Sequence, residues 1–174
     1  AGYDIDKEQE FIKENISWMF GQDYFGIGWA SLEKNMQLAT AFLGLSKQEG
    51  NAKIAALLKR FHLEEKRHTD VWRLSSGMVA KYCLAIALLK NPKILFLDEP
   101  LIGLDTYAKD EIRAILKEIN EKGTTIIYTD HQLQEVEKIC KRLLIINEGK
   151  LLFDGSAKKL KQLYRDTNVL DVVC

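Results

Sequence analysis

The chain has 174 residues, of which 47% are hydrophobic and 29% are charged, and its 25 basic and 25 acidic side chains balance. This is the composition of an ordinary globular protein, large enough for one domain with a core or for a compact domain with an appendage. The charge balance excludes a global field that would attract nucleic acid or anionic lipid, although it is compatible with a local basic patch.

No stretch of the sequence has the character of a membrane span or a secretory signal. The longest apolar run, Cys83–Leu89, is far shorter than the roughly 20 residues that a transmembrane helix requires, so any membrane association would come through a partner. The three cysteines, Cys83, Cys140 and Cys174, have no C-x-x-C spacing, which is typical of reduced thiols in a cytoplasmic protein. The first residue is Ala1 and not Met, which suggests a fragment.

The segment from about Ala30 to Arg73 is predicted to be helical. Its apolar residues recur at intervals of three and four, so that they share one face of a helix, and no strand-like pattern interrupts them. The residues that form these two stripes are Leu32, Met36, Ala39 and Leu43, followed by Ile54, Leu57, Leu58 and Phe61.

From Leu74 onward, helical patterns alternate with short apolar runs. Ser75 or Ser76 can cap a helix that ends before Asn91-Pro92, because the residue before a proline disfavours helical geometry. The run Ile94–Leu97 predicts a strand covered on both faces. After it come a helix from about Ala108 to Gly123, the strand "TTIIYT", a short helix from Leu133, the strands "RLLIIN" and "KLLF" joined at Glu148-Gly149, and a helix from Ser156 to about Tyr164. This alternation predicts an α/β fold with a mostly parallel sheet flanked by helices.

Two adjacent carboxylates, Asp98 and Glu99, follow the apolar strand in "ILFLDEP". Ligands of parallel sheets bind at the carboxyl ends of the strands, where His131 also falls, just after "TTIIYT". The aspartate could hold magnesium on a phosphate substrate while the glutamate polarises a water molecule. The residues alone leave another interpretation open, in which the acids cap the next segment and His131 only begins a helix.

The motifs together resemble the ATP-binding subunits of ABC transporters. "LSSGM" is similar to their signature motif, "ILFLDEP" to Walker B, "GLD" to the D-loop, "IIYTDHQ" to the switch-histidine segment and "SWMFGQ" to the Q-loop, in the expected order and spacing. The resemblance covers essentially the whole chain and is greatest to the branch with a separate membrane subunit. It implies an incomplete P-loop NTPase-like ABC ATPase core with an inserted helical subdomain.

The resemblance also implies a domain plan. Residues 1–22 would be the end of an N-terminal sheet subdomain and the Q-loop. Residues 23–91 would be the helical subdomain with the signature motif, and residues 92–174 the α/β catalytic subdomain with Walker B, the D-loop and the switch histidine.

Roles for the catalytic residues follow from the same resemblance. Asp98 and Gln22 would contact the magnesium ion of Mg²⁺-ATP, and Glu99 would orient or deprotonate the attacking water. His131 would hydrogen-bond the γ-phosphate. Gln22 would also report nucleotide occupancy to the helical subdomain.

A second group of residues is expected to bind the nucleotide of an opposite subunit. Ser75, Ser76 and Gly77 lie at a predicted helix N-terminus, which favours phosphate, and glycine permits close approach. Asp105 would then lie on the dimer seam. Ser76 and Met78 replace the family's usual glycine and glutamine, and we interpret both changes as tolerated.

The sequence lacks the P-loop pattern G-x-x-x-x-G-K-[ST] that cradles phosphates. Gly21 and Gly26 have the right separation, but Ile27 and Gly28 follow them. We expect the chain to be part of a longer or split subunit; the alternative is a chain that pairs with a complete partner and forms at most one complete site. In either case the isolated chain is predicted to be inactive. As a fragment it is also expected to expose the sheet edge that the P-loop strand normally covers, and to be poorly soluble or partly molten.

The implied function is an ATP-binding and ATP-hydrolysing subunit that couples hydrolysis to solute transport. Its cofactors would be ATP and Mg²⁺, and its partners a transmembrane permease subunit and a second nucleotide-binding subunit in a homo- or heterodimer, with no nucleic acid expected. It would be cytoplasmic and peripheral on the inner face of the cell membrane. The alternatives are a nucleotide-independent regulatory or interaction module, disfavoured by the presence of both Glu99 and His131, and a soluble ABC ATPase acting on ribosomes or DNA.

Overall fold

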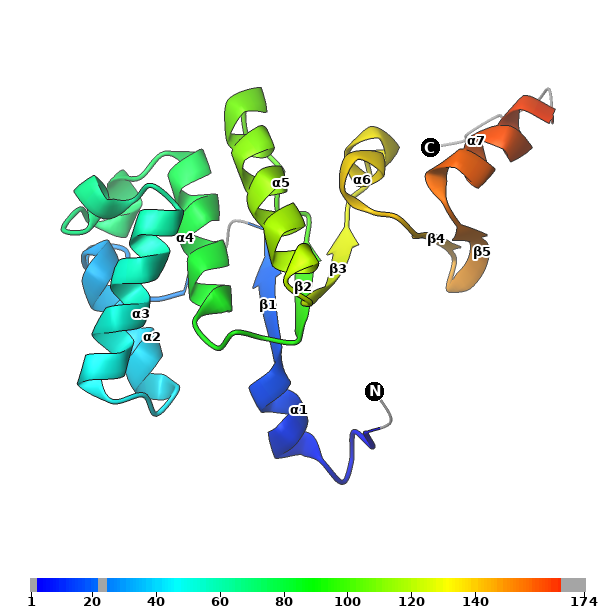
Figure 1. Ribbon diagram of the computed structural model, residues 1–174. Helices are drawn as coiled ribbons and strands as arrows, with labels where there is room; N and C mark the ends of the chain where they lie inside the picture. The colour runs from blue at the N-terminus through cyan, green and yellow to red at the C-terminus, as the bar shows by residue number, and fades with distance from the viewer. Residues whose placement is uncertain (1–2, 22–24, 167–174) are drawn as a thin grey trace. The chain divides into compact units, whose positions relative to one another are not determined.

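The computed structural model describes residues 3–21 and 25–166, with the side chains of 164–166 excepted (Figure 1). The chain divides into two compact units, residues 1–129 and residues 130–174. Each unit is considered by itself below.

In the first unit, residues 30–73 are mainly helical, as their periodicity predicts. Two of its helices begin at serines: Ser31 accepts a hydrogen bond from a backbone N–H of the first turn of its helix, and Ser46 forms a capping box with Glu49. In chain order the elements are α1 (Gln9–Asn15), β1 (Ile16–Phe20), α2 (Leu32–Phe42), α3 (Lys47–Arg60), two 3₁₀ turns (Glu64–Lys66 and Val71–Arg73) and α4 (Ser76–Leu88).

The rest of the first unit supplies the strands that complete a parallel sheet. It consists of β2 (Ile94–Asp98), α5 (Thr106–Glu121) and β3 (Thr125–Thr129). The strand order is β1-β2-β3, and both pairs of neighbours are parallel. The register aligns the last residues of the three strands, so their carboxyl ends form one edge.

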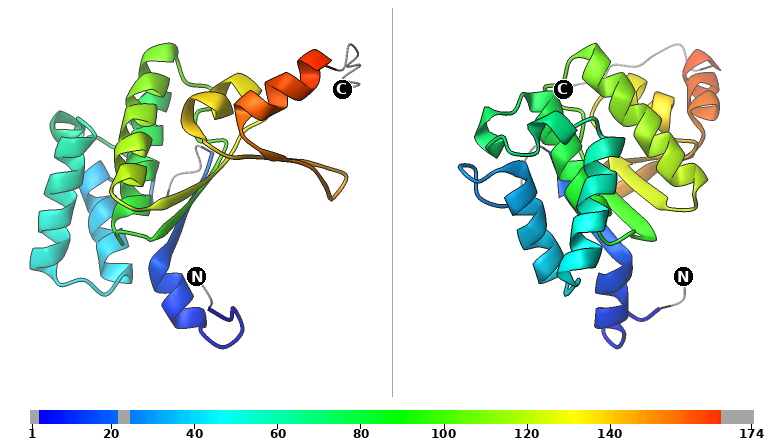
Figure 2. Two further views of the ribbon diagram at one scale, coloured as in Figure 1. Left: turned by 45° about the vertical axis from the view of Figure 1, so that its right-hand side comes forward. Right: turned by 60° about the vertical axis from the view of Figure 1, so that its left-hand side comes forward.

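One face of this sheet is covered by α4 and α5, which lie on the same side of the strands (Figure 2). Leu95 and Leu97 of β2 are buried beneath these helices. Tyr82 of α4 and Leu116 of α5 belong to the same core. Helices α2 and α3 pack beside α4 (Figure 1).

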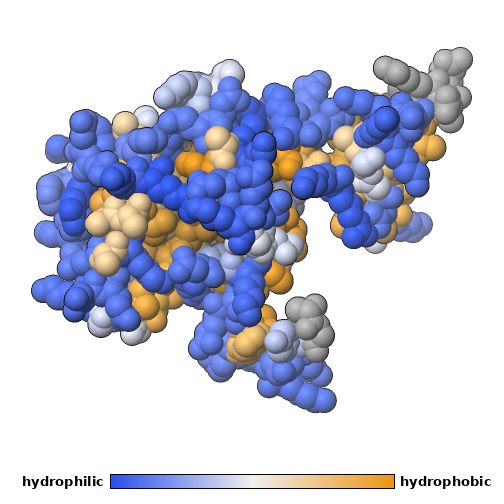
Figure 3. Space-filling view, viewed as in Figure 1, coloured by the Kyte–Doolittle hydropathy of each residue, from blue (hydrophilic) through white to orange (hydrophobic). Residues whose placement is uncertain are grey.

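The opposite face of the sheet is apolar but open, and the prediction that the strand Ile94–Leu97 is covered on both faces is wrong. Phe96 is 38% exposed, whereas the residues on either side of it are buried. Trp18 and Ile127 pair with Phe96 in register and are 53% and 45% exposed. In Figure 3, hydrophobic residues, coloured orange, are visible on the surface among hydrophilic residues, coloured blue.

The second unit contains α6 (Leu133–Ile139), β4 (Leu143–Asn147), β5 (Lys150–Gly155) and α7 (Ala157–Asp166). The two strands are antiparallel. They meet at the predicted turn, where Glu148 and Gly149 have φ angles of 48° and 72°. Two positive angles are what a two-residue hairpin turn of type I′ requires.

Two further expectations concern thiols and membrane spans. Cys83 and Cys140 are free thiols, as predicted, and burial raises the pKa of the Cys140 thiol. Cys174 lies outside the described residues. Within the described ranges, no helix combines the length and hydropathy of a membrane-crossing segment.

Candidate functional site

The acid pair lies at the aligned carboxyl ends of the strands. Asp98 is the last residue of β2 and pairs in register with Phe20 of β1 and Thr129 of β3. Its carboxylate accepts a hydrogen bond from the Thr129 hydroxyl. The side chain is exposed and not enclosed by the core, so the open end of the sheet, and not a buried internal partner, accommodates the charge.

Glu99 has an unusual backbone conformation. Its φ angle is 45°, in the left-handed region that side chains other than glycine rarely occupy. The backbone N–H of Glu99 donates to both the carbonyl and the hydroxyl oxygen of Thr129, at 3.2 and 3.3 Å. Such a conformation costs of order 1–3 kcal/mol and is concentrated at functional sites. Glu148, in the turn between β4 and β5, has nearly the same φ angle, so the conformation alone assigns no role to Glu99.

A backbone hydrogen bond joins the residue that follows β1 to the end of β2. Gly21 N–H donates to the Asp98 carbonyl at 2.7 Å. Gln22, predicted to contact magnesium, lies outside the described residues. Its predicted role rests on the sequence resemblance and on its position one residue after Gly21.

His131 belongs to the second unit and follows the last residue of β3 by two positions. It precedes α6, which begins at Leu133. Its Nδ1 lies 3.9 Å from the Asp130 carboxylate, and its Nε2 lies 3.4 Å from the amide nitrogen of Gln132. The imidazole is exposed, and the role of His131 in sensing phosphate stays a prediction from the sequence.

The signature residues occupy the start of α4, as predicted. Ser75 is the N-cap, and its hydroxyl accepts from Met78 N–H at 3.3 Å. Ser76 and Gly77 form the first turn, where backbone N–H groups have no acceptor within the helix. A Cβ atom at Gly77 would lie 3.0 Å from the Cβ of Ala108. Glycine therefore eases the close approach of α4 to α5 here, apart from any contact with phosphate.

Asp105 is the N-cap of α5. Its carboxylate accepts from Ala108 N–H at 2.8 Å. Because Ala108 is also the neighbour of Gly77, the first turns of α4 and α5 lie side by side. The structure thus brings the predicted signature and D-loop residues to one pair of helix N-termini.

Two residues that form hydrogen bonds at or near this site were not predicted from the sequence. Thr129 contacts both members of the acid pair, and Tyr82 donates its hydroxyl to the Phe25 carbonyl at 2.7 Å. The first contact depends on the β2–β3 register, and the second joins residues 57 positions apart. No local sequence pattern signals either one.

The oxygen ligands at the carboxyl ends of the strands are suited to magnesium that is bound to a nucleotide, and not to magnesium alone. Among the described residues, no group of three or more His, Cys, Asp or Glu side chains could hold a metal alone. Magnesium commonly takes one or two carboxylates together with water and substrate phosphates. The carboxylate of Asp98 beside the Thr129 hydroxyl fits that pattern of hard oxygen ligands.

Comparison with known proteins decides the family. The sequence model described as "ABC transporter" matches residues 2–102, more than half of the chain. The chain belongs to the ABC transporter family. This confirms the resemblance inferred from the motifs. The family includes ATP-binding subunits, which have the α/β fold seen here.

Relatives of this ABC protein include ATP-binding proteins of several bacteria. The ABC transporter ATP-binding protein NatA of Bacillus subtilis (strain 168) is 27% identical over 97% of this chain and 68% of its own length. The Nod factor export ATP-binding protein I of Burkholderia thailandensis is 33% identical over 82% of this chain and 47% of the relative. The linearmycin resistance ATP-binding protein LnrL of Bacillus subtilis is 30% identical over 92% and 51%. The chain thus spans about half the length of the latter two.

Solved structures of ABC proteins have the same fold. CbiO1 from Clostridium perfringens, part of the ABC transporter complex CbiONQ, superposes with a TM-score of 0.76 at 28% identity. The alignment covers 90% of this chain and 64% of that one. A second structure, an ATP-binding subunit of an ABC transporter, gives a TM-score of 0.75 at 25% identity, over 94% and 68% of the two chains.

Proposed function

We propose that this chain is the ATP-hydrolysing part of an ABC transporter subunit and that the carboxyl end of its parallel sheet faces the triphosphate. One observation carries the proposal. Asp98 and the strained Glu99 stand together at the aligned strand ends, both held by Thr129. Family membership supports ATP as the ligand.

Each group at this strand end has a proposed chemical role. The Asp98 carboxylate, with Gln22, would hold Mg²⁺, which neutralises charge on the phosphates when bound. Glu99 would accept a proton from, or orient, the water that attacks the γ-phosphate. His131 would hydrogen-bond the γ-phosphate through its exposed imidazole.

The phosphate cradle is proposed to reach this site from a segment or subunit outside the present sequence. No G-x-x-x-x-G-K-[ST] pattern occurs in the 174 residues. The isolated chain is therefore expected to hydrolyse no ATP. In a dimer of nucleotide-binding subunits, the free N–H groups of Ser76 and Gly77 would contact the nucleotide of the opposite subunit. Asp105 would lie at the seam between the subunits.

A transmembrane permease subunit is the proposed partner for coupling hydrolysis to transport. An apolar groove of about 380 Å³ lies between α2, α4 and the edge strand β1. The groove is lined mainly by apolar residues such as Phe25, Phe42 and Ile86, together with the basic residue Lys90. An amphipathic helix of the permease fits such a groove, which would place the chain at the cytoplasmic face of the membrane.

The decisive experiment replaces the proposed base. With a P-loop-bearing segment joined to the chain, we expect magnesium-dependent ATPase activity. Glu99→Gln should lower kcat by about 10²-fold or more, because a general base contributes about 10²–10⁴ to the rate. Binding of ATP should persist, since the amide preserves the shape of the side chain.

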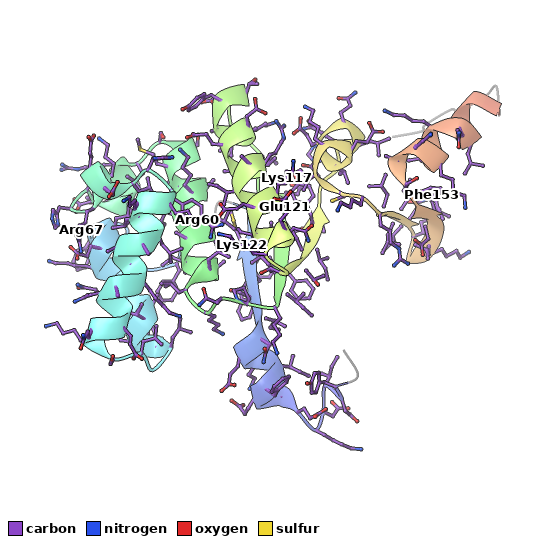
Figure 4. The ribbon with its side chains drawn as sticks, viewed as in Figure 1. Arg60, Arg67, Lys117, Glu121, Lys122 and Phe153 are labelled. Carbon is purple, nitrogen blue, oxygen red and sulfur yellow. The ribbon has the colours of Figure 1, made fainter. Side chains whose placement is uncertain are left out.

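Glu121→Gln is the matched control. Glu121 is exposed at the end of α5, where its carboxylate lies 4.0 Å from Lys117 (Figure 4). The same chemical change there should leave kcat unaltered. Undiminished turnover in Glu99→Gln, or activity that survives removal of magnesium, would contradict the proposed mechanism.

A further inference from the structure

Thr129, the last residue of β3, contacts both acids of the proposed site through one hydroxyl group. That hydroxyl donates a hydrogen bond to the Asp98 carboxylate. It also accepts a hydrogen bond from the backbone N–H of Glu99 at 3.3 Å. All three residues lie within the first unit. A threonine hydroxyl has one proton and two lone pairs, so a single group here is the donor to one acid and an acceptor from the other.

The contact with Thr129 decides how the Asp98 carboxylate is oriented. The torsion that rotates the plane of an aspartate carboxyl group is soft, because it joins an sp³ to an sp² carbon and has broad minima. Asp98 is exposed, so packing in the core does not fix that plane either. The hydrogen bond to one carboxylate oxygen therefore sets the direction in which the other oxygen points.

Thr129 is itself held in place by the sheet. It pairs in register with Asp98 across the parallel β2–β3 ladder, and its backbone carbonyl accepts from the Glu99 N–H at 3.2 Å. Its β-branched side chain has restricted freedom about χ1. The strand therefore presents the hydroxyl at a defined place, which the unbranched side chain of serine would do less firmly.

The two hydrogen bonds of the hydroxyl form a short chain from Glu99 to Asp98. The Glu99 N–H is shared between the carbonyl and hydroxyl oxygens of Thr129, and the hydroxyl proton is directed to Asp98. Hydrogen bonds in such a chain polarise and strengthen one another. Removal of the hydroxyl therefore releases the Asp98 side chain and leaves the Glu99 N–H with a weaker hold on β3.

We propose that Thr129 is a positioning residue of the hydrolytic site. Its hydroxyl orients the Asp98 carboxylate that would hold Mg²⁺, and it fixes the backbone from which the Glu99 side chain projects. This inference rests on the proposed function. Threonine is also a favourable strand residue, so a purely structural role is the competing interpretation.

The affinity for magnesium separates these two interpretations. Magnesium demands near-ideal octahedral geometry, so it is sensitive to the orientation of each carboxylate ligand. The loss of a hydrogen bond that orients a metal ligand typically costs about 10–100-fold in metal affinity or activity. The loss of a strand-forming side chain alone would lower stability and leave the metal affinity unchanged.

The test uses Thr129→Val in the assembly that contains the P-loop segment, because valine keeps the β-branch and replaces only the hydroxyl. We expect the free Mg²⁺ concentration for half-maximal ATPase activity to rise about tenfold. Mn²⁺, followed by its EPR signal, should also bind about tenfold more weakly when a non-hydrolysable ATP analogue is present. Without nucleotide or metal, hydrogen–deuterium exchange of the Glu99 amide should be faster than in the parent.

Two matched variants isolate the effect of the hydroxyl. Thr129→Ser keeps a hydroxyl on an unbranched side chain and should retain a metal affinity within about threefold of the parent. Thr125→Val makes the same change on the same face of β3 at its other end, where Thr125 pairs with Ile94, and should change none of these readings. The melting temperature of Thr129→Val should stay close to that of the parent, because valine has high strand propensity.

The remaining outcomes separate this inference from the proposed function. A parent assembly that hydrolyses no ATP would overturn both. An active parent whose Thr129→Val variant keeps the parent's affinities for Mg²⁺ and Mn²⁺ would overturn the role of Thr129 alone. Equal losses in Thr129→Val and Thr129→Ser, or a Thr129→Val variant that no longer folds, would show a structural role and would also overturn the inference. Unaltered exchange of the Glu99 amide would overturn the proposed hold on Glu99.

Discussion

At the scale of single residues, Glu99 shows a conflict between stability and function. A glutamate gains nothing for folding from a left-handed backbone, yet its N–H bonds to Thr129 keep it there. Glu148, in the β4–β5 turn, has nearly the same φ angle, 48° against 45°. The two positions therefore share a conformation, and only one of them belongs to the proposed site.

This pair allows a matched prediction. Glu99→Gly and Glu148→Gly should each raise the free energy of unfolding by about 0.5–1 kcal/mol, because relief of left-handed strain outweighs the added freedom of glycine in the unfolded chain. Thermal melts should rise by a few degrees in both variants. Only Glu99→Gly should abolish ATP hydrolysis in the P-loop-containing assembly. A drop in melting temperature for both would contradict the strain argument.

At the scale of elements, ion pairs join the helices of the first unit. Lys81 of α4 and Glu111 of α5 lie 2.6 Å apart and are largely shielded from solvent. Glu118 of α5 contacts Arg60 of α3 at 3.0 Å and Lys122 at 2.5 Å. Arg60 and Lys122 are labelled in Figure 4. The second group connects α3 to α5 near their carboxyl ends.

The Glu118 contacts predict a dependence of stability on pH. The hydrogen bond from Lys122, and then Arg60, lowers the pKa of Glu118 below its ordinary 4.5. A lowered pKa in the folded state means that the contribution is complete above about pH 4.5 and is lost as pH falls through the lower folded value. Because the side chain is partly exposed, the contribution should be about 1 kcal/mol or less.

Urea denaturation at a series of pH values measures this contribution. Glu118→Gln should be less stable than the parent at pH 7, and the difference should shrink toward pH 3. Glu121→Gln, for which Lys117 stands 4.0 Å away, serves as the control and should show a smaller difference throughout. A constant gap between Glu118→Gln and the parent across the pH range would argue against a role for the charge.

At the scale of the whole molecule, the open apolar face of the sheet dominates the expected behaviour in solution. Trp18, Phe96 and Ile127 form one row across three strands, and Phe20 follows at the end of β1 with 55% exposure. Contiguous exposed apolar surface of this kind promotes association. In the described part of the chain, β1 and β3 also pair on one side only, and such edges add to that tendency.

Polar substitution on this face should reduce self-association. We expect Phe96→Thr combined with Ile127→Thr to lower light scattering and binding of a hydrophobic dye, because both side chains are partly exposed and threonine retains strand propensity. The melting temperature should change little. Leu97→Thr, on the buried face of the same strand, should instead destabilise the fold and increase dye binding. Equal scattering by the double variant and the parent would show that this face does not drive association.

From Ala30 onward the sequence by itself determined most of the secondary structure, and its motifs determined the family. Helix α1 and strand β1, which precede Ala30, were not predicted. Helical periodicity, the serine cap at Ser75, the glycine after α5 and the Glu148-Gly149 turn are local signals, because capping and turn geometry are set within a few residues. The order of the motifs along the chain likewise identified the ABC family. The roles of Asp98, Glu99 and His131 stay predictions, and the Glu99 variants test the role of Glu99.

Only the tertiary structure decided which faces are covered and which distant groups meet. A continuous apolar run has the same pattern whether one or both faces of its strand are buried. The sequence therefore gave no sign that Phe96 is exposed. The contacts of Thr129 with the acid pair and of Tyr82 with Phe25 depend on strand register and helix packing. They join residues 30 to 57 positions apart, a separation that local patterns do not encode.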